Sequence, residues 1–238
     1  MKSLIKSLIP NRLLKLIIFI RNNYFDGYSI KSYSQEGEDM ILMRIFGKQQ
    51  IGFYVDVGAH HPFRFSNTYF FYKQGWKGIN IDAMPESMKL FQKFRPRDIN
   101  LEIPISNNDR LLTYYAFNEP ALNGFSRELS KVRDGNNGYF IQQEIELQTS
   151  KLSSVLDKHL PNGVEIDFLS IDVEGLDLDI LHSNDWNKYK PRIILVEILG
   201  SSLSEIENSE FAIFLKKYSY IVFAKTMNTV IFIQETVS

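Results

Sequence analysis

Short apolar segments alternate with helical segments along most of this 238-residue chain, and the alternation restricts the folds that the chain can adopt. Five apolar segments have the length and composition of buried strands, at residues 53–57, 78–82, 99–105, 166–171 and 192–198. Segments with helical spacing lie between and after them, the longest at 204–218. Strands that alternate with helices form a mostly parallel sheet with helices on both faces. The sequence therefore predicts an α/β fold, and the runs 220–224 and 229–233 predict an antiparallel hairpin at one edge.

The composition limits both the location and the partners that we expect. The chain contains no cysteine, which excludes disulfides, thiolate metal sites and a cysteine nucleophile, and suits a reducing, cytoplasmic location. The net charge is -1, so no overall charge attracts nucleic acid, and we expect no nucleic-acid partner. We expect a basic amphipathic segment at residues 1–30 and one large domain at 31–238. A polar stretch near 118–138 predicts a loop or lid inserted in that domain, because loops of this length usually have such a role.

The first 25 residues combine basic and apolar side chains and contain no acidic one. The basic residues of this segment are Lys2, Lys6, Arg12, Lys15 and Arg21. The longest apolar run, Leu16 to Ile20, is far shorter than the roughly 20 residues that span a bilayer, and Pro10 and Arg12 interrupt the apolar region that a signal peptide needs. Two interpretations remain open. The segment is either a helix docked on the protein body or on a second subunit, or a helix through which residues 1–25 lie on the anionic inner face of a membrane.

Acidic residues stand at the ends of the predicted strands. Asp56, Asp82 and Asp172 end or directly follow three of them, and Glu197 lies inside a fourth. Ligands of such sheets bind at the carboxyl ends of the strands. Burying carboxylates beside apolar strands is costly unless they are paired or hydrogen-bonded. Four acids at one edge of the sheet therefore indicate a ligand that supplies hydroxyl or ammonium donors.

The turn after the first strand contains a single glycine, Gly58, followed by Ala59, His60, His61 and Pro62. A dinucleotide site needs three glycines to seat a pyrophosphate on a helix N-terminus, and this turn lacks the other two. An acid at the end of the next strand, here Asp82, suits a ribose diol. One glycine and a ribose acid without a pyrophosphate cradle indicate a nucleoside cofactor such as S-adenosylmethionine.

Four motifs in the same order resemble the FkbM-type methyltransferases. They are SQEGED at 34–39, FYVDVGAH at 53–60, ID at 81–82 and LSIDVEG at 169–175, within a similarity that covers roughly residues 33 to 233. The resemblance implies the class I methyltransferase fold, a Rossmann-like, mostly parallel seven-stranded sheet. It also implies O-methylation by S-adenosylmethionine, often of sugar hydroxyls on glycans, glycolipids or natural products.

The resemblance further implies which residues contact the cofactor. They are Asp56, Gly58 and Asp82, with Ser34 and Gln35 near its methionine end and Ser106 near the adenine. The segment after Asp82 departs from the family pattern, because Ala83 and Met84 separate this acid from Pro85. The register of the ribose contact is therefore open.

Methyl transfer to an alcohol needs a general base, because a free hydroxyl is a poor nucleophile. We expect Asp172, Glu174 and His61 to be the catalytic residues, with Asp172 favoured over its alternative role of capping the next helix. For Glu174 capping and catalysis are equally open, and His61 lies in a turn where it has the alternative role of bonding the backbone. Asp172, Glu174 and Glu197 also offer oxygen ligands to Mg²⁺, but their spacing is not diagnostic, and we expect no metal.

The sequence thus predicts an S-adenosylmethionine-dependent O-methyltransferase that acts on a small-molecule or glycan acceptor. Asn123, Phe125, Ser126 and Arg127 in the polar stretch are the predicted acceptor contacts, and Trp76 is a further candidate for stacking on a sugar. The alternatives are a nucleotide-sugar or dinucleotide-dependent oxidoreductase on a similar sheet and a non-catalytic nucleotide-binding module. The oligomeric state is not predicted.

Overall fold

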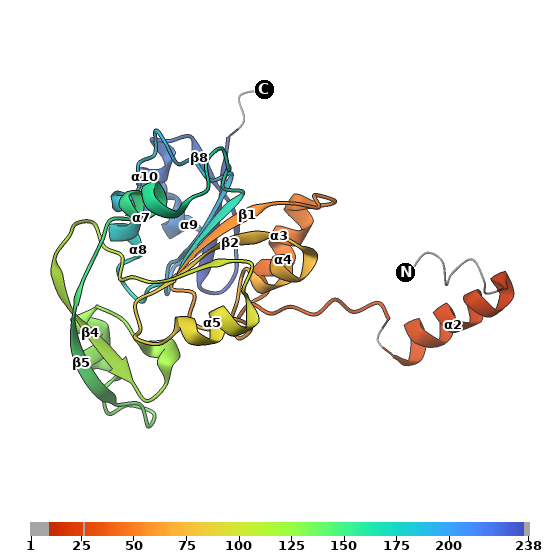
Figure 1. Cartoon of the computed structure of the whole chain (residues 1–238), viewed down its shortest axis with the longest axis horizontal. Coiled ribbons are helices and arrows are strands. Elements are labelled where there is room, and N and C mark those ends of the chain that lie inside the picture. Colours follow the sequence, from red (N-terminus) through yellow and green to blue (C-terminus); the bar gives the residue numbers. More distant parts are fainter. Residues whose placement is uncertain (1–9, 26, 236–238) are drawn as a thin grey trace. The chain divides into compact units, whose positions relative to one another are not determined.

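The structure, a computed structural model, describes residues 10–25 and 27–235. The chain divides into two compact units, residues 1–32 and residues 33–238. In the first unit, helix α2 (Asn11–Tyr24) begins directly after Pro10, a residue that is tolerated at helix starts. The other described helices and strands belong to the second unit (Figure 1). Residues 1–9 of the predicted N-terminal segment lie outside the described residues.

The main sheet of the second unit has seven strands in the order β3-β2-β1-β6-β7-β9-β8. The strands are β1 (Phe53–Val57), β2 (Lys77–Asp82), β3 (Ile99–Glu102), β6 (Phe168–Ile171), β7 (Ile193–Glu197), β8 (Tyr220–Lys225) and β9 (Thr229–Gln234). The strands from β3 through β7 pair in parallel, and β9 pairs antiparallel with β7 and with β8. The predicted α/β sheet with an antiparallel C-terminal hairpin is confirmed. The strand order reverses between β1 and β6, which is where such sheets bind their ligands.

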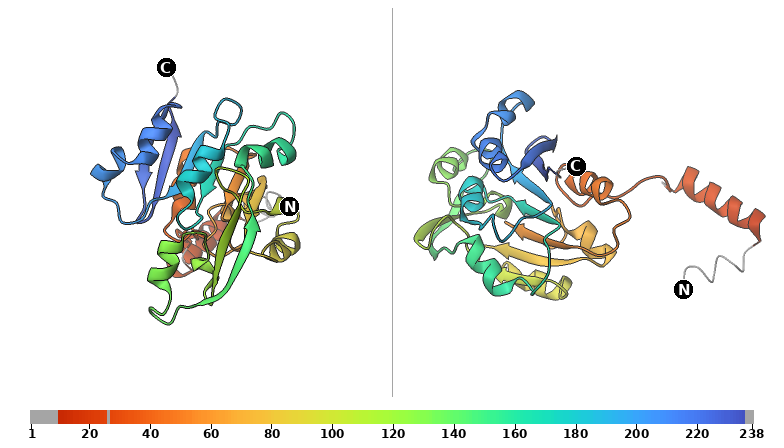
Figure 2. Two further views of the ribbon diagram at one scale, coloured as in Figure 1. Left: turned by 90° about the vertical axis from the view of Figure 1, so that its left-hand side faces the viewer. Right: turned by 90° about the horizontal axis from the view of Figure 1, so that it is seen from above.

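Helices cover both faces of this sheet (Figure 2). They are α3 (Glu38–Phe46), α4 (Tyr69–Gln74), α5 (Met88–Phe94), α7 (Leu152–His159), α8 (Asp177–Ser183), α9 (Leu203–Glu207) and α10 (Glu210–Lys216). Because side chains alternate along a strand, β1 contributes to two cores. Val55 and Val57 pack in a cluster with residues of α7, α8 and α10, whereas Tyr54 packs in a second cluster with residues of α3 and α4.

Two predicted elements are shorter than expected. The predicted helix at 204–218 is divided into α9 and α10, because Ser209 caps a new helix by accepting a hydrogen bond from the backbone N–H of Ala212. The predicted strand at 99–105 ends at Glu102, and Ile105 forms only an isolated bridge with Ser150. Pro104 lacks the N–H that a continuous ladder requires.

An antiparallel ribbon of two strands, β4 (Leu111–Phe117) and β5 (Ile141–Gln148), lies outside the main sheet (Figure 1). The segment between them, predicted as a loop or lid, contains the short turn η1 (Pro120–Leu122) and helix α6 (Arg127–Arg133). Side-chain caps explain this local order. Glu119 accepts a hydrogen bond from the N–H of Ala121, and Ser126 accepts one from the N–H of Leu129. We call residues 111–148 the insertion.

Candidate functional site

One pocket lies at the carboxyl ends of the parallel strands, where the insertion approaches them. The residues that line it from the main sheet and its loops include Gly58, His60, Asp82, Met84, Asp172, Glu174 and Glu197. The insertion contributes Tyr114 and the continuous stretch of residues 120–125. The pocket therefore lies at the edge where the strand-end acids were predicted to meet a ligand.

Gly58 allows the loops after β1 and β6 to meet. Its φ is +84°, and a Cβ there would lie 1.7 Å from the carbonyl oxygen of Asp172. Any other residue would clash with this backbone, and the backbone N–H of Asp172 is itself held by the carbonyl of Val57 at 3.0 Å. The glycine that the sequence singled out is therefore required by the contact that closes the floor of the pocket.

Asp82, at the end of β2, is held by two backbone donors. The N–H of His60 donates to its Oδ2 and the N–H of Met84 donates to its Oδ1, both at 2.8 Å. Burial raises the pKa of Asp82, and these two hydrogen bonds oppose that shift. A carboxylate oxygen can accept more than one hydrogen bond, so both oxygens keep acceptor capacity toward the pocket. The arrangement suits a ligand with two adjacent hydroxyl groups.

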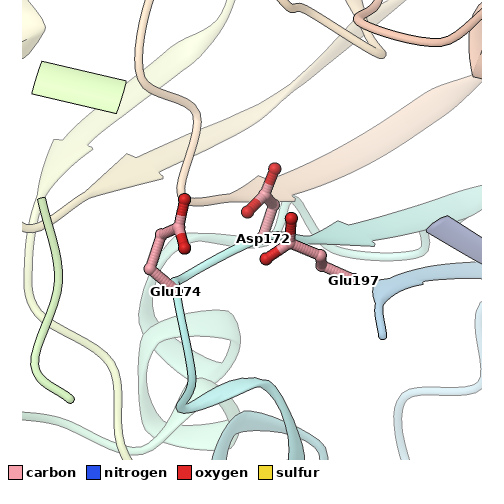
Figure 3. A group of neighbouring side chains, drawn as sticks. All are labelled: Asp172, Glu174 and Glu197. Carbon is pink, nitrogen blue, oxygen red and sulfur yellow. The ribbon is translucent and has the colours of Figure 1, made fainter. Parts of the chain in front are cut away.

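Three carboxylates converge at the ends of β6 and β7. Asp172, Glu174 and Glu197 offer oxygen atoms that all lie within 4.8 Å of one another (Figure 3). The Asp172 side chain is accessible to solvent from the pocket. The protein around it nevertheless desolvates the carboxylate, and this desolvation, together with repulsion from Glu197, raises the pKa of Asp172 well above its usual range. Burial and repulsion from Glu174 raise the pKa of Glu197 to about 8. The cluster therefore retains protons near neutral pH and favours a cationic or proton-donating ligand.

Glu174 connects this cluster to the insertion. Arg133 of α6 donates to its Oε2 at 2.6 Å, in an ion pair whose side chains are 21% and 15% exposed. Glu174 also has a φ of +55°, a conformation that costs a non-glycine residue energy and that often marks functional sites. Gly124 of the insertion approaches it so closely that a Cβ there would lie 2.9 Å from the Cβ of Glu174. The insertion is thus anchored at the strand ends beside the acids.

Asp177 shapes the loop that carries Asp172 and Glu174. It accepts hydrogen bonds from the N–H groups of Val173 and Gly175, at 3.2 and 3.1 Å. Burial raises the pKa of Asp177 to about 6. Asp177 thus holds the loop that precedes α8. The helix itself has no side-chain cap, so neither Asp172 nor Glu174 performs the capping role that was their alternative.

The two histidines after Gly58 differ in their surroundings. His61 Nδ1 accepts hydrogen bonds from the N–H groups of Phe63 and Arg64, both at 3.1 Å, and His61 is not among the residues that line the pocket. His60 does line the pocket and has a φ of +52°, and its Nε2 is buried with no hydrogen-bond partner in the part of the chain that the structure describes. Burial lowers the pKa of both imidazoles. His61, the predicted catalytic histidine, is thus engaged by the backbone, and His60 is the histidine that faces the ligand space.

Asp56 belongs to a buried polar network and does not line the pocket. Thr68 Oγ1 donates to Asp56 Oδ2 at 2.9 Å, and Arg95 Nη1 donates to Thr68 Oγ1 at 2.9 Å. Arg95 also forms an ion pair with Asp98 at 2.8 Å, in which neither side chain is exposed. Burial raises the pKa of Asp56, and Arg95 opposes that shift. Asp56 lies on the same side of β1 as Tyr54. The Tyr54 hydroxyl donates a hydrogen bond to Asp98 and accepts one from Arg95, so it belongs to the same network.

Of the remaining predicted cofactor residues, one lines the pocket and two do not. Gln35 lines the pocket. Ser34 does not, and its Oγ donates to Asp39 Oδ1 at 2.8 Å. Ser106 is fully buried, its hydroxyl has no hydrogen-bond partner among the described residues, and it lies outside the pocket lining, next to Ile105, which is part of it.

Of the predicted acceptor contacts, Asn123 and Phe125 line the pocket, whereas Ser126 and Arg127 do not. Ser126 caps α6 instead. Trp76, considered as a sugar platform, is 1% exposed and packs in the core with α3 and α4.

Sequence reasoning missed Phe65, Met84, Tyr114, Leu122 and Arg133. None of them lies in a motif. Tyr114, Leu122 and Arg133 belong to the insertion, so only its position at the strand ends identifies them, and Phe65 and Met84 lie in the loops after β1 and β2.

The pocket fits a nucleoside cofactor in its shape and its donor set. Gly58 and Asp82 lie at the ends of the two adjacent strands β1 and β2, and the apolar side chains of Ile103 and Ile105 line the same pocket. Asp82 supplies acceptors for a ribose, and the apolar side chains suit a base. Asp172, Glu174 and Glu197 form the one described cluster of potential metal ligands, but Glu174 is already paired with a cation, Arg133.

The model of the FkbM methyltransferase domain family matches residues 56–222. No curated protein sequence matches the chain. Among solved structures, a TehB-like SAM-dependent methyltransferase from Corynebacterium glutamicum is similar, with 10% identity and a TM-score of 0.38 over 94% of this chain and 100% of that chain. YjhP from E. coli has 12% identity and a TM-score of 0.31 over 91% of this chain and 71% of its own. TM-scores this low indicate only a loose likeness, so the assignment rests on the family model.

The residues matched by that model make up more than half of the chain and include Gly58, Asp82, Asp172 and Glu197. The sheet order and the C-terminal hairpin agree with the class I methyltransferase fold that the resemblance implied. The chain therefore belongs to the FkbM methyltransferase family and is an S-adenosylmethionine-dependent methyltransferase.

Proposed function

We propose that this methyltransferase acts on a hydroxyl group of a sugar, in a glycan or a related small molecule. The observation that carries the proposal is the convergence of Asp172 and Glu197 in the pocket that Gly58 and Asp82 also line. An alcohol must lose its proton as it attacks, and carboxylates with raised pKa values are strong enough bases to receive it near neutral pH. An amine acceptor would need no such base once it is deprotonated.

The cofactor, when bound, supplies an electrophilic methyl group on a sulfonium. Asp82 would accept hydrogen bonds from the ribose hydroxyls of the cofactor, and the backbone N–H groups of His60 and Met84 fix this carboxylate in place. The negative charge that Asp172 and Glu197 gain as they lose protons with rising pH attracts the cationic sulfonium before reaction. The chain's contribution to rate is then largely positioning, as expected for an in-line displacement.

Asp172 is the base in this proposal. With the cofactor bound, its sulfonium would supply the methyl group to the acceptor oxygen and leave as a neutral thioether, and the Asp172 carboxylate would receive the hydroxyl proton. Burial, together with repulsion from Glu197, Asp177 and Glu174, keeps the pKa of Asp172 high, which strengthens it as a base. The proton-accepting form of this coupled cluster increases as the pH rises toward about 8, the pKa of Glu197, so turnover should increase over the same range.

The acceptor enters between the strand ends and the insertion. Phe125 of the insertion and Phe65, which is 41% exposed, both line the pocket and offer aromatic faces on which sugar rings commonly stack. Asn123 lines it too and offers an amide to sugar hydroxyls, although its Oδ1 already accepts from the N–H of Phe117 at 2.7 Å. Mixed aromatic and polar walls beside carboxylates support a sugar over a purely apolar acceptor.

The test is methyl transfer from S-adenosylmethionine with an isotopically labelled methyl group to fractionated cell glycans. We expect label in alkali-stable ethers, and we expect Asp172→Asn to lower turnover by roughly 10²–10⁴-fold, the usual contribution of a general base. The matched control is Asp109→Asn, an exposed aspartate outside the pocket, which should retain full turnover. Label in alkali-labile esters or in amines, or full turnover by Asp172→Asn, would overturn the proposal.

A further inference from the structure

Helix α2 carries an apolar stripe along one side. Leu13, Leu16, Ile17, Ile20 and Tyr24 recur three and four residues apart, a spacing that places them on one side of an α-helix. All five are exposed, from 40% for Ile20 to 74% for Tyr24. The described part of the first unit contains no second helix or strand. Among residues 10–25 and 27–32, no other helix or strand is present to cover the stripe.

The charge of α2 is entirely positive. Arg12, Lys15 and Arg21 are its ionisable side chains apart from Tyr24, and residues 1–25 contain no acid. Arg12 stands in the first turn, where the helix dipole favours acidic residues and disfavours basic ones. This charge pattern does not stabilise the isolated helix. It suits a partner that is itself anionic.

The same charges disfavour a second copy of the helix as the partner. Two α2 helices packed along their apolar stripes would bring like charges together, with no acid on either helix to compensate them. The helix is also too short to cross a membrane. Its 14 residues extend about 21 Å, against about 30 Å for a bilayer core. No helix among residues 10–25 and 27–235 is long and apolar enough for a span.

We propose that α2 binds the surface of an anionic lipid bilayer. The apolar stripe lies among the upper acyl chains, and Arg12, Lys15 and Arg21 contact phosphate groups of the lipids. Tyr24 and Phe25, at the end of the helix, carry aromatic rings of the kind that gather at the headgroup level. None of the residues that line the methyl-transfer pocket belongs to α2.

Co-sedimentation of the full chain with vesicles tests the proposal. The vesicles contain either phosphatidylcholine alone or phosphatidylcholine mixed with phosphatidylglycerol. We expect binding to the mixed vesicles that weakens as salt is added, and little binding to phosphatidylcholine alone. Neutralising three basic residues in R12Q/K15Q/R21Q should weaken binding to the mixed vesicles on the order of 100-fold, because each basic residue near such a surface contributes about a factor of five. I17D/I20D should abolish it.

The matched control removes the same charge elsewhere. K158Q/K190Q/K216Q neutralises three exposed lysines of the second unit and should bind the mixed vesicles as the wild type does. Equal loss in this control, or equal binding to both kinds of vesicle, overturns the proposal. A fall in thermal stability of I17D/I20D without vesicles would show that α2 packs on the protein body, and a dimer in sedimentation velocity that I17D/I20D dissociates would assign the stripe to a second copy.

Discussion

Asp82→Asn separates the binding role of this carboxylate from its structural role. In the wild type the two carboxylate oxygens accept hydrogen bonds from the backbone N–H groups of His60 and Met84, each at 2.8 Å. Asp82 also lines the pocket. An asparagine side chain has one acceptor oxygen and one NH₂ donor. One backbone N–H would therefore face another donor, and the charged acceptor for a ribose hydroxyl would be lost.

The expected magnitude follows from these bonds. A hydrogen bond to a charged group contributes about 1.5–3 kcal/mol, so the loss of one to the ribose raises the dissociation constant of S-adenosylmethionine by roughly ten- to a hundred-fold. Stability should change little. Burial raises the pKa of Asp82, which means that the folded state bears a cost for its charge, and the neutral amide removes that cost while losing one backbone hydrogen bond.

Isothermal titration calorimetry measures the affinity, and a thermal melt measures the stability. Asp98→Asn is the matched control, since Asp98 is also a buried acid of the sheet region, 8% exposed, but does not line the pocket. It should lower the melting temperature by weakening the Arg95 network and leave the cofactor affinity of the folded protein unchanged. Wild-type affinity in Asp82→Asn, or an equal loss of affinity in both variants, would refute the reasoning.

Four further predictions concern stability, catalysis and metal. Asp98→Ala should cost roughly 3–5 kcal/mol in urea unfolding, because it leaves the buried Arg95 charge without its partner. Arg133→Gln removes the cation that pairs with Glu174, so acceptor KM should rise several-fold with cofactor affinity unchanged; unchanged kinetics would exclude a role for this ion pair. The raised pKa of Glu197 means that the native state holds a proton which the unfolded state releases from about pH 4.5 upward, so stability falls as the pH rises to about 8. Glu197→Gln should therefore melt at a higher temperature than the wild type above pH 8, with the difference vanishing near pH 4.5; the reverse trend would contradict the shift. Adding a chelator of divalent ions should leave turnover unchanged, because Arg133 already neutralises part of the cluster; loss of turnover that Mg²⁺ restores would show a metal site.

The sheet and the strand-end acids could be predicted from sequence because both follow from local patterns. Each parallel strand is an apolar run, and the residue after it must lie at the same edge of the sheet as the others. The prediction that Gly58 and Asp82 contact the cofactor followed from what a nucleoside without a pyrophosphate requires of its site. For these reasons the predicted site lies at the edge of the sheet where the structure has its pocket.

The finer assignments depended on contacts between distant segments. Asp82 ends β2, but Asp56 lies one residue before the end of β1, where it joins Thr68 and Arg95, and the sequence gives no sign of that network. His60 and His61 are neighbours, yet His60 has a left-handed φ and lines the pocket, whereas His61 bonds the backbone. The ion pair of Arg133 with Glu174 joins residues that are 41 positions apart, and no spacing rule indicates it.

A crystal structure with bound S-adenosylhomocysteine tests the assignment of the pocket most directly. The ribose hydroxyls should lie within hydrogen-bonding distance of the Asp82 oxygens, and the sulfur should face the acids Asp172 and Glu197. A ligand bound away from Gly58 and Asp82, or one whose sulfur faces away from Asp172, would contradict the account.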